Sequence, residues 1–364
     1  MRYLSIDVLR MVAIFVMVWV HFLENLSGVE SSITGFGAPL FSFLAGVSYC
    51  LWIEQQRERL SSEAISKISI RRGLFVFGVG IAFNVLVWLP EDTFNWDVLT
   101  LIGTALLILN ASRHMPDYVL LMAAGSSIFV APMLQGLADY NSYWPENYYD
   151  GGLTLSGILI GYFVVGYFPF FPWISYALVG YVLGRRLFTQ ETALRIDWKP
   201  VCCIGLGLLL FAFGLHWLSS QLGGSFAASA INRQVLSGWK MYPPSVEYVI
   251  GTLGITLLMF GGLLHFIDGS KQPERWERRL SLTRSFSRYS FSIYILHHLV
   301  HIWPLWIFAL LRGEEPTAYW RVAMTVPYSA GLATLFLMGL TLFLYCRGDR
   351  TPVGMERAMR WLCD

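Results

Sequence analysis

Apolar positions along the chain gather in continuous runs of about twenty residues, the length of helix that crosses a ~30 Å hydrocarbon core. These runs predict ten transmembrane helices, at approximately 7–26, 33–53, 70–90, 96–111, 116–137, 169–187, 200–219, 246–267, 289–311 and 322–346. The predicted fold is therefore all-α, a polytopic membrane helical bundle of about ten transmembrane helices.

One shorter apolar run, 153–167, leads directly into Phe168, Pro169 and Pro172. Proline removes a helical hydrogen bond and clashes with the preceding turn, so a straight span cannot continue there. We predict one short interfacial or re-entrant helix near 153–167, not an additional span.

The composition agrees with a membrane protein. Only 14% of the residues are charged, against roughly 25% in soluble domains, and the mean hydropathy is +0.53. No stretch between the apolar runs reaches ~50 residues, the lower size of an ordinary domain. We predict a single transmembrane domain over 1–364.

The distribution of positive charge predicts the orientation. With ten spans and the N-terminus inside, all but four of the 26 Lys and Arg residues fall on the cytoplasmic side, the four being Arg233, Lys240, Arg312 and Arg321. An eleventh span at 153–167 would place the basic 271–288 loop and the C-terminal tail on the outer side of the membrane. The positive-inside rule therefore favours ten spans with both termini cytoplasmic.

Three ionisable residues lie in the first predicted span: Asp7, Arg10 and His21. Helical geometry puts Arg10 and His21 on one stripe, ~16 Å apart in rise, and Asp7 one turn before Arg10. Such residues are costly in lipid and need a partner or a function. Asp7 can simply mark the membrane boundary, whereas His21 is suited to proton transfer near neutral pH.

The ninth predicted span holds three histidines, His297, His298 and His301, with Tyr294 and His301 on the same face as His297. We predict a polar cavity here. His297 is a candidate catalytic residue, while His298 and His301 are expected to face loops or packing. No carboxylate lies among them, so we predict no metal, although His297 and His301 have a workable ligand spacing.

Three further residues are candidates for the site. Asp97 follows Trp96 at the predicted outer surface, where it can orient a histidine or simply favour a helix N-terminus. Arg71 and Arg72 lie at the inner end of the third span. A pair of arginines suits phosphate binding, but positive-inside anchoring explains the pair equally well.

The sequence contains no P-loop, dinucleotide fingerprint, nucleophile elbow or zinc motif. Redox, phosphoryl-transfer and hydrolase activities therefore have no support, and no nucleic-acid partner is expected. The five cysteines have neither metal-like nor disulfide-like spacing and are interpreted as packing residues.

Several motifs in order along the chain resemble the transmembrane acyltransferase superfamily. Arg10 and His21 have the spacing typical of its acyltransferase-3 branch. The heparan-α-glucosaminide N-acetyltransferase branch is similar at further segments, namely 5–10, Trp96–Leu99 with Ile102 and Gly103, 171–173 with 180–185, 242–245 and 294–297. The resemblance covers nearly the whole chain, and the motifs together are more specific than any one of them.

The resemblance implies an acyl-CoA-dependent O- or N-acyltransferase in a bacterial inner membrane. Acetyl-CoA or another acyl-CoA would enter from the cytosol, with Arg10, Arg71 and Arg72 holding its phosphates. His21 would deprotonate a hydroxyl or amine of an extracytoplasmic glycan or small-molecule acceptor, assisted by His297 or Asp97. An acyl-histidine intermediate and a homo-oligomer both remain open.

Two other functions remain open at this point. A transporter or flippase of a lipid-linked or sugar substrate would also carry intramembrane charges along its pathway, although no internal repeat is visible. A non-catalytic membrane scaffold would tolerate substitution of Arg10 and His21.

Overall fold

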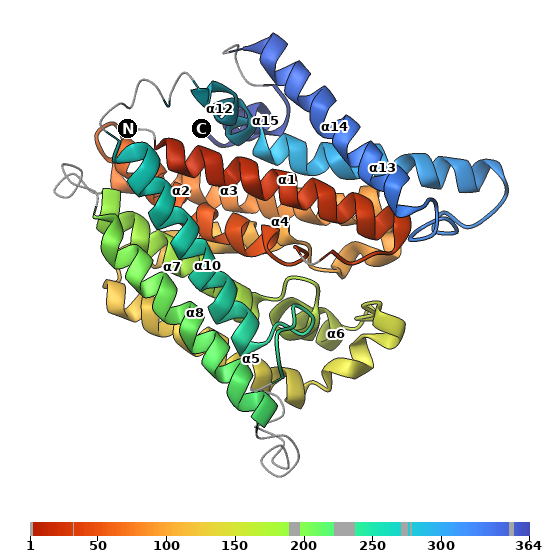
Figure 1. Cartoon of the computed structure of the whole chain (residues 1–364), viewed down its shortest axis with the longest axis horizontal. Coiled ribbons are helices and arrows are strands. Elements are labelled where there is room, and N and C mark those ends of the chain that lie inside the picture. Colours follow the sequence, from red (N-terminus) through yellow and green to blue (C-terminus); the bar gives the residue numbers. More distant parts are fainter. Residues whose placement is uncertain are drawn as a thin grey trace.

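The computed structural model describes residues 3–31, 33–188, 197–221, 237–270, 276, 279–348 and 353–364. Throughout these residues the regular structure is helical, with no strand (Figure 1). Seven of the Lys and Arg residues counted in the charge argument lie outside the described residues, namely Arg2, Arg195, Arg233, Lys271, Arg275, Arg278 and Arg350.

The helices match the predicted spans closely. They are α1 Leu4–Ser27, α2 Gly37–Arg57, α3 Ser62–Phe83, α4 Val98–Ala111, α5 Asp117–Leu137, α6 Leu155–Ile160, α7 Phe170–Phe188, α8 Trp198–Gln221, α10 Val246–Leu263, α12 Ser281–Arg288, α13 Ser290–Leu311, α14 Val326–Arg347 and α15 Met355–Cys363. Within the described chain, nine helices are long and apolar enough to cross a membrane, and a bent pair at 155–188 makes a tenth if it counts as one span. The predicted all-α bundle of about ten spans is confirmed.

The segment 153–167 begins and ends beside the same loop. Before it, the hydroxyl of Tyr148 donates to Asp92 at 2.5 Å. After it, the amide groups of Tyr167 and Phe168 donate to the carbonyl oxygens of Asn95 and Trp96. Since 92–96 directly precedes α4, this segment returns to the end of the bundle from which it started, as a re-entrant helix does.

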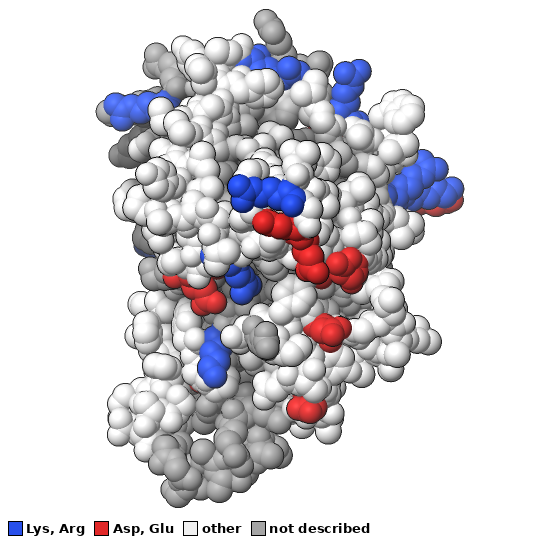
Figure 2. All heavy atoms as spheres, turned by 90° about the vertical axis from the view of Figure 1, so that its right-hand side faces the viewer, with Lys and Arg blue, Asp and Glu red and all other residues white. Residues whose placement is uncertain are grey.

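Other loops that ten alternating spans place on one side also meet at this end. The ring of Trp144 lies 5.3 Å from that of Tyr242, and the amide of Arg321 donates to the carbonyl oxygen of Asn25. Figure 2 views this side of the molecule, and acidic side chains occupy the centre of the face with basic ones among and above them. We call this the outer end, following the orientation that the charge distribution predicts.

Close helix contacts depend on glycine. A Cβ on Gly46 of α2 would lie 2.0 Å from the carbonyl oxygen of Ala177, and one on Gly180 of α7 would lie 2.1 Å from that of Phe43. These are distances that no side chain tolerates, so α2 and α7 can approach this closely only because both positions are glycine.

Helix α1 lies in the middle of the assembly, in contact with α2, α10, α12, α13 and α14 (Figure 1). Both of its predicted site residues therefore face other helices. Helix α8 is different: it packs mainly on α10 at the edge of the bundle and leaves most of its surface for lipid.

Candidate functional site

Arg10 is held in place at the inner end of α1 by two serines. Its guanidinium donates to the hydroxyl of Ser48 on α2 at 2.5 Å and to the hydroxyl of Ser287 on α12. These contacts fix the direction of the charged group before any ligand arrives.

A cavity of about 340 Å³ begins beside this guanidinium. Its volume is within the ~300–1,000 Å³ usual for small-molecule sites. Arg10, Trp52, Arg72 and Met359 line the inner part, and apolar side chains of α2 and α4 line the rest as far as Tyr294 on α13. The cavity is thus charged at one end and mainly apolar along its length.

The two neighbouring arginines of α3 have different surroundings. The Arg72 side chain lines the cavity, lies 4.5 Å over the Trp52 ring and donates twice to Asp364 of α15, at 2.9 and 2.6 Å. Arg71 is exposed and does not line the cavity. The structure therefore brings Arg10 and Arg72 together and leaves Arg71 apart.

The Tyr294 hydroxyl, at the deep end of the cavity, donates to the carboxylate of Asp97 at 2.5 Å. Asp97 also caps α4 by accepting from the amide of Leu99, which is the helix N-terminal role considered above. Asp97 follows the 92–96 segment of the outer end, where both Trp96 and Asp97 are buried within the protein. Trp96 has a φ of +61°, and this turn directs Asp97 inward.

Beyond Tyr294 lies a pair of stacked imidazoles. The Nδ1 of His21 is 2.9 Å from the Nε2 of His297, and the two ring planes are inclined by 12°. His298 completes a group of three, in which one ligand atom from each ring lies within 4.8 Å of the others. His297 and His298 are buried, whereas His21 keeps some exposure.

The hydrogen-bond partners determine where the protons of this pair lie. The Nδ1 of His297 faces the carbonyl oxygen of Ile293 at 3.1 Å, and a carbonyl oxygen only accepts, so this nitrogen carries the proton. In the neutral ring the Nε2 is then an acceptor, and His21 must donate to it from Nδ1. It follows that the Nε2 of His21 carries a free electron pair and can act as a base.

His301 is buried and packed in the same polar interior. Its Nδ1 faces the carbonyl oxygen of His297 at 2.5 Å, and its Nε2 lies 2.9 Å from the amide nitrogen of Asn25. The amide oxygen of Asn25 accepts from the indole of Trp320. This chain ties the outer end of α1 to α13 and to the loop before α14.

His298, expected to face a loop or packing, is buried and lies against His21, with ring centroids 4.6 Å apart. The cavity differs from the polar cavity that was predicted around the histidines of the ninth span. It is lined mostly from α2, α3, α4 and α13, and His21 does not line it. One helical turn of α13, from Tyr294 to His297, separates the cavity from the imidazole pair.

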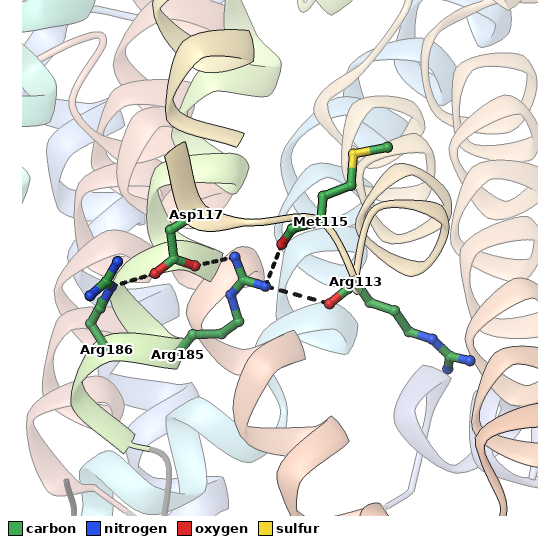
Figure 3. Close-up of polar contacts among 5 residues, drawn as sticks. All are labelled: Arg113, Met115, Asp117, Arg185 and Arg186. Carbon is green, nitrogen blue, oxygen red and sulfur yellow. Dashed lines mark hydrogen bonds and ion pairs between the residues drawn. The ribbon is translucent and has the colours of Figure 1, made fainter. Parts of the chain in front are cut away.

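A second basic group lies at the inner end, between α5 and α7 (Figure 3). Arg185 and Arg186 both pair with Asp117, and Arg185 also donates to the carbonyl oxygens of Met115 and Arg113. Because these donors are engaged within the protein, the group serves mainly to fasten α5 to α7.

The outer end near His298 is rich in aromatic side chains. The rings of His298 and Trp320 lie 5.4 and 5.7 Å from that of Trp88. Tyr148 donates to Asp92 beside them, and burial together with this carboxylate raises the pKa of Tyr148 above its usual range, so the hydroxyl stays protonated. A shallow depression between Trp88, Asp92 and Trp320 opens here.

Sequence reasoning did not single out Asn25 or Trp320, although Asn25 lies four residues after His21 and hence on the same helix face. For Trp320 no local pattern was available, because its contact with Asn25 joins segments 295 residues apart.

Comparison with known proteins adds to this geometry. The sequence model of one protein family, the catalytic domain of heparan-alpha-glucosaminide N-acetyltransferase, matches residues 2–220. The chain belongs to this family. A comparison with curated proteins found no match.

The match covers α1 to α8 and so includes Arg10, His21, Arg72 and Asp97, whereas Tyr294 and His297 follow it. The protein is thus a multi-pass integral membrane protein of the transmembrane acetyltransferase type.

Proposed function

We propose that this protein transfers an acyl group, acetyl being favoured, from cytosolic acyl-CoA across the membrane to an extracytoplasmic acceptor. The acceptor offers a hydroxyl or an amine, and a sugar or glycan is the favoured class. The proposal rests on one cavity. Arg10 and Arg72 line its inner end, and the His21–His297 pair lies one helical turn beyond its outer end.

The inner half of the site suits the donor. Phosphate groups bind guanidinium groups through charge-assisted hydrogen bonds, and Arg10 and Arg72 both line the cavity where it is charged. The apolar length beyond them suits the linear arm that carries a thioester. In this proposal Arg71, which is exposed, contributes only to the general positive field.

The base is His21. When the acceptor attacks the thioester carbonyl, its O–H or N–H proton passes to the Nε2 of His21. The C–S bond then breaks, and the departing CoA thiolate takes this proton from His21 and leaves as the thiol. His297 accepts from the Nδ1 of His21 before and after this step, so it orients the ring. Asp97 acts through Tyr294, which it holds at the end of the cavity.

Partial exposure of His21 and the aromatic outer end suit an acceptor that arrives from the other side. Aromatic rings and carboxylates are common partners of sugars. Trp88, Asp92 and Trp320 line the depression at the outer end, where such an acceptor would arrive. The family match favours transfer over transport. A bacterial inner membrane as the location is part of this proposal.

The test is mass spectrometry of extracytoplasmic glycans and lipids from cells with and without the protein. We expect one or more species to carry an added acyl group that disappears on deletion. Wild-type protein should restore the species and His21→Gln, which keeps bulk and polarity but cannot act as the base, should not. Identical profiles in all strains would contradict the proposal.

A further inference from the structure

The group formed by His21, His297 and His298 has a property that base catalysis does not require: three imidazoles converge, and no carboxylate from the described residues belongs to the group. A tetrahedral zinc ion bound at ~2.0–2.1 Å needs nitrogen ligands about 3.3 Å apart. His21 and His297 are at 2.9 Å, and all three ligand atoms lie within 4.8 Å of one another.

The protons of the two histidines on α13 are arranged as in metal sites. The Nδ1 atoms of His297 and His298 face the carbonyl oxygens of Ile293 and Tyr294, both at 3.1 Å. Both rings therefore present an unprotonated Nε2. In metal-binding histidines the nitrogen that does not bind the metal usually donates its N–H to an acceptor such as a backbone carbonyl oxygen. His21 completes the set once its proton moves from Nδ1 to Nε2 of the same ring.

We propose that His21, His297 and His298 bind a divalent ion that prefers nitrogen ligands, Zn²⁺ being the best fit. The fourth position stays open for water on the side where His21 is exposed. Metal binding and base catalysis exclude each other, because a metal on Nδ1 leaves Nε2 protonated and unable to accept a proton. The inhibitory consequence rests on the proposed function, whereas the metal site itself does not.

His301 provides a matched control. It lies on the same helix face as His297 and is buried to a similar degree, but its Nε2 already accepts from Asn25. Substituting His301 therefore removes a buried imidazole without removing a ligand.

The experiment uses the full chain, purified in detergent with a tag that contains no histidine, stripped with EDTA and titrated with Co²⁺. The visible absorption of the bound ion reports nitrogen ligation without acyl-CoA or acceptor. We expect wild type to bind one equivalent, His301→Gln to bind equally well, and His298→Gln to bind at least tenfold more weakly. Should His298→Gln not fold, His21→Gln replaces it with the same expectation.

No absorption band in wild type overturns the proposal. So does a ligand variant that binds like wild type, or a His301→Gln variant that binds as weakly as the ligand variant. Acyl transfer measured with and without Zn²⁺ then tests the consequence: zinc should inhibit wild type, and EDTA should reverse the inhibition. Cobalt binding without any acyl transfer would contradict the proposed function and leave the metal site standing.

Discussion

Arg10→Ala is the substitution whose effect the structure predicts most sharply. The guanidinium lines the cavity and is already oriented by Ser48 and Ser287, so little further ordering is needed when a phosphate binds. A charge-assisted hydrogen bond contributes about 1.5–3 kcal/mol, which corresponds to roughly tenfold to 150-fold in Kd. We expect Arg10→Ala to weaken acyl-CoA binding by that factor.

Arg72→Ala should have a smaller effect. Arg72 has to exchange its contacts with Asp364 for the ligand, and a partly exposed ion pair of this kind is worth about 0–1 kcal/mol. The net loss on substitution is reduced by about that amount. Arg10→Lys should be intermediate between wild type and Arg10→Ala, because an ammonium keeps the charge but cannot reach both serines with a planar fork.

The assay is calorimetric titration of purified protein with a non-hydrolysable acyl-CoA analogue, with thermal unfolding measured to verify that each variant folds. Arg71→Ala is the matched control, since it removes the same charge from the neighbouring residue outside the cavity. Its Kd should stay within about twofold of wild type. Unchanged affinity in folded Arg10→Ala, or an equal loss in Arg71→Ala, would refute the assignment of the phosphate end.

Two further predictions concern stability, and both are measured by thermal unfolding in detergent. Gly46→Ala should destabilise the bundle by about 1–3 kcal/mol or more, because the new methyl group would lie 2.0 Å from the carbonyl oxygen of Ala177. The control is Gly207→Ala, whose methyl group meets open space, so this variant should be as stable as wild type or more stable. Equal unfolding temperatures of the two variants would contradict the close approach of α2 and α7. Tyr294→Phe removes the hydroxyl that donates to buried Asp97, and the free energy of unfolding should fall by about 1–3 kcal/mol. Adding Asp97→Asn to the same chain should restore most of this stability. A Tyr294→Phe variant as stable as wild type would rule out that hydrogen bond.

The spans were predictable from sequence because length and hydropathy are local properties. The re-entrant segment at 153–167 was predictable as well, since the prolines that follow it limit any continuation of the helix. The charge distribution then assigned each loop to one side of the membrane. The structure brings loops assigned to the outer side together at one end of the bundle, as ten alternating spans require.

The candidate site was only partly predictable. The Arg10–His21 stripe follows from helical geometry alone, but the contact between His21 and His297 joins positions 276 residues apart. The sequence favoured neither Arg71 nor Arg72, because neighbours on a helix point about 100° apart and nothing local tells which way α3 faces. The hydrogen bond between Asp97 and Tyr294 was not predictable either, because it joins positions 197 residues apart.

Transfer across the membrane by a histidine base is the central claim, and reconstitution tests it most directly. Purified protein in liposomes receives isotopically labelled acetyl-CoA on the side of Arg10 and a mixture of sugar and amine acceptors on the other side. Labelled product is measured by mass spectrometry over time. We predict that label appears on the far-side acceptor with wild type and falls by about 10²–10⁴-fold with His21→Gln, while acetyl-CoA affinity is nearly unchanged. Near-normal transfer by folded His21→Gln would contradict the account.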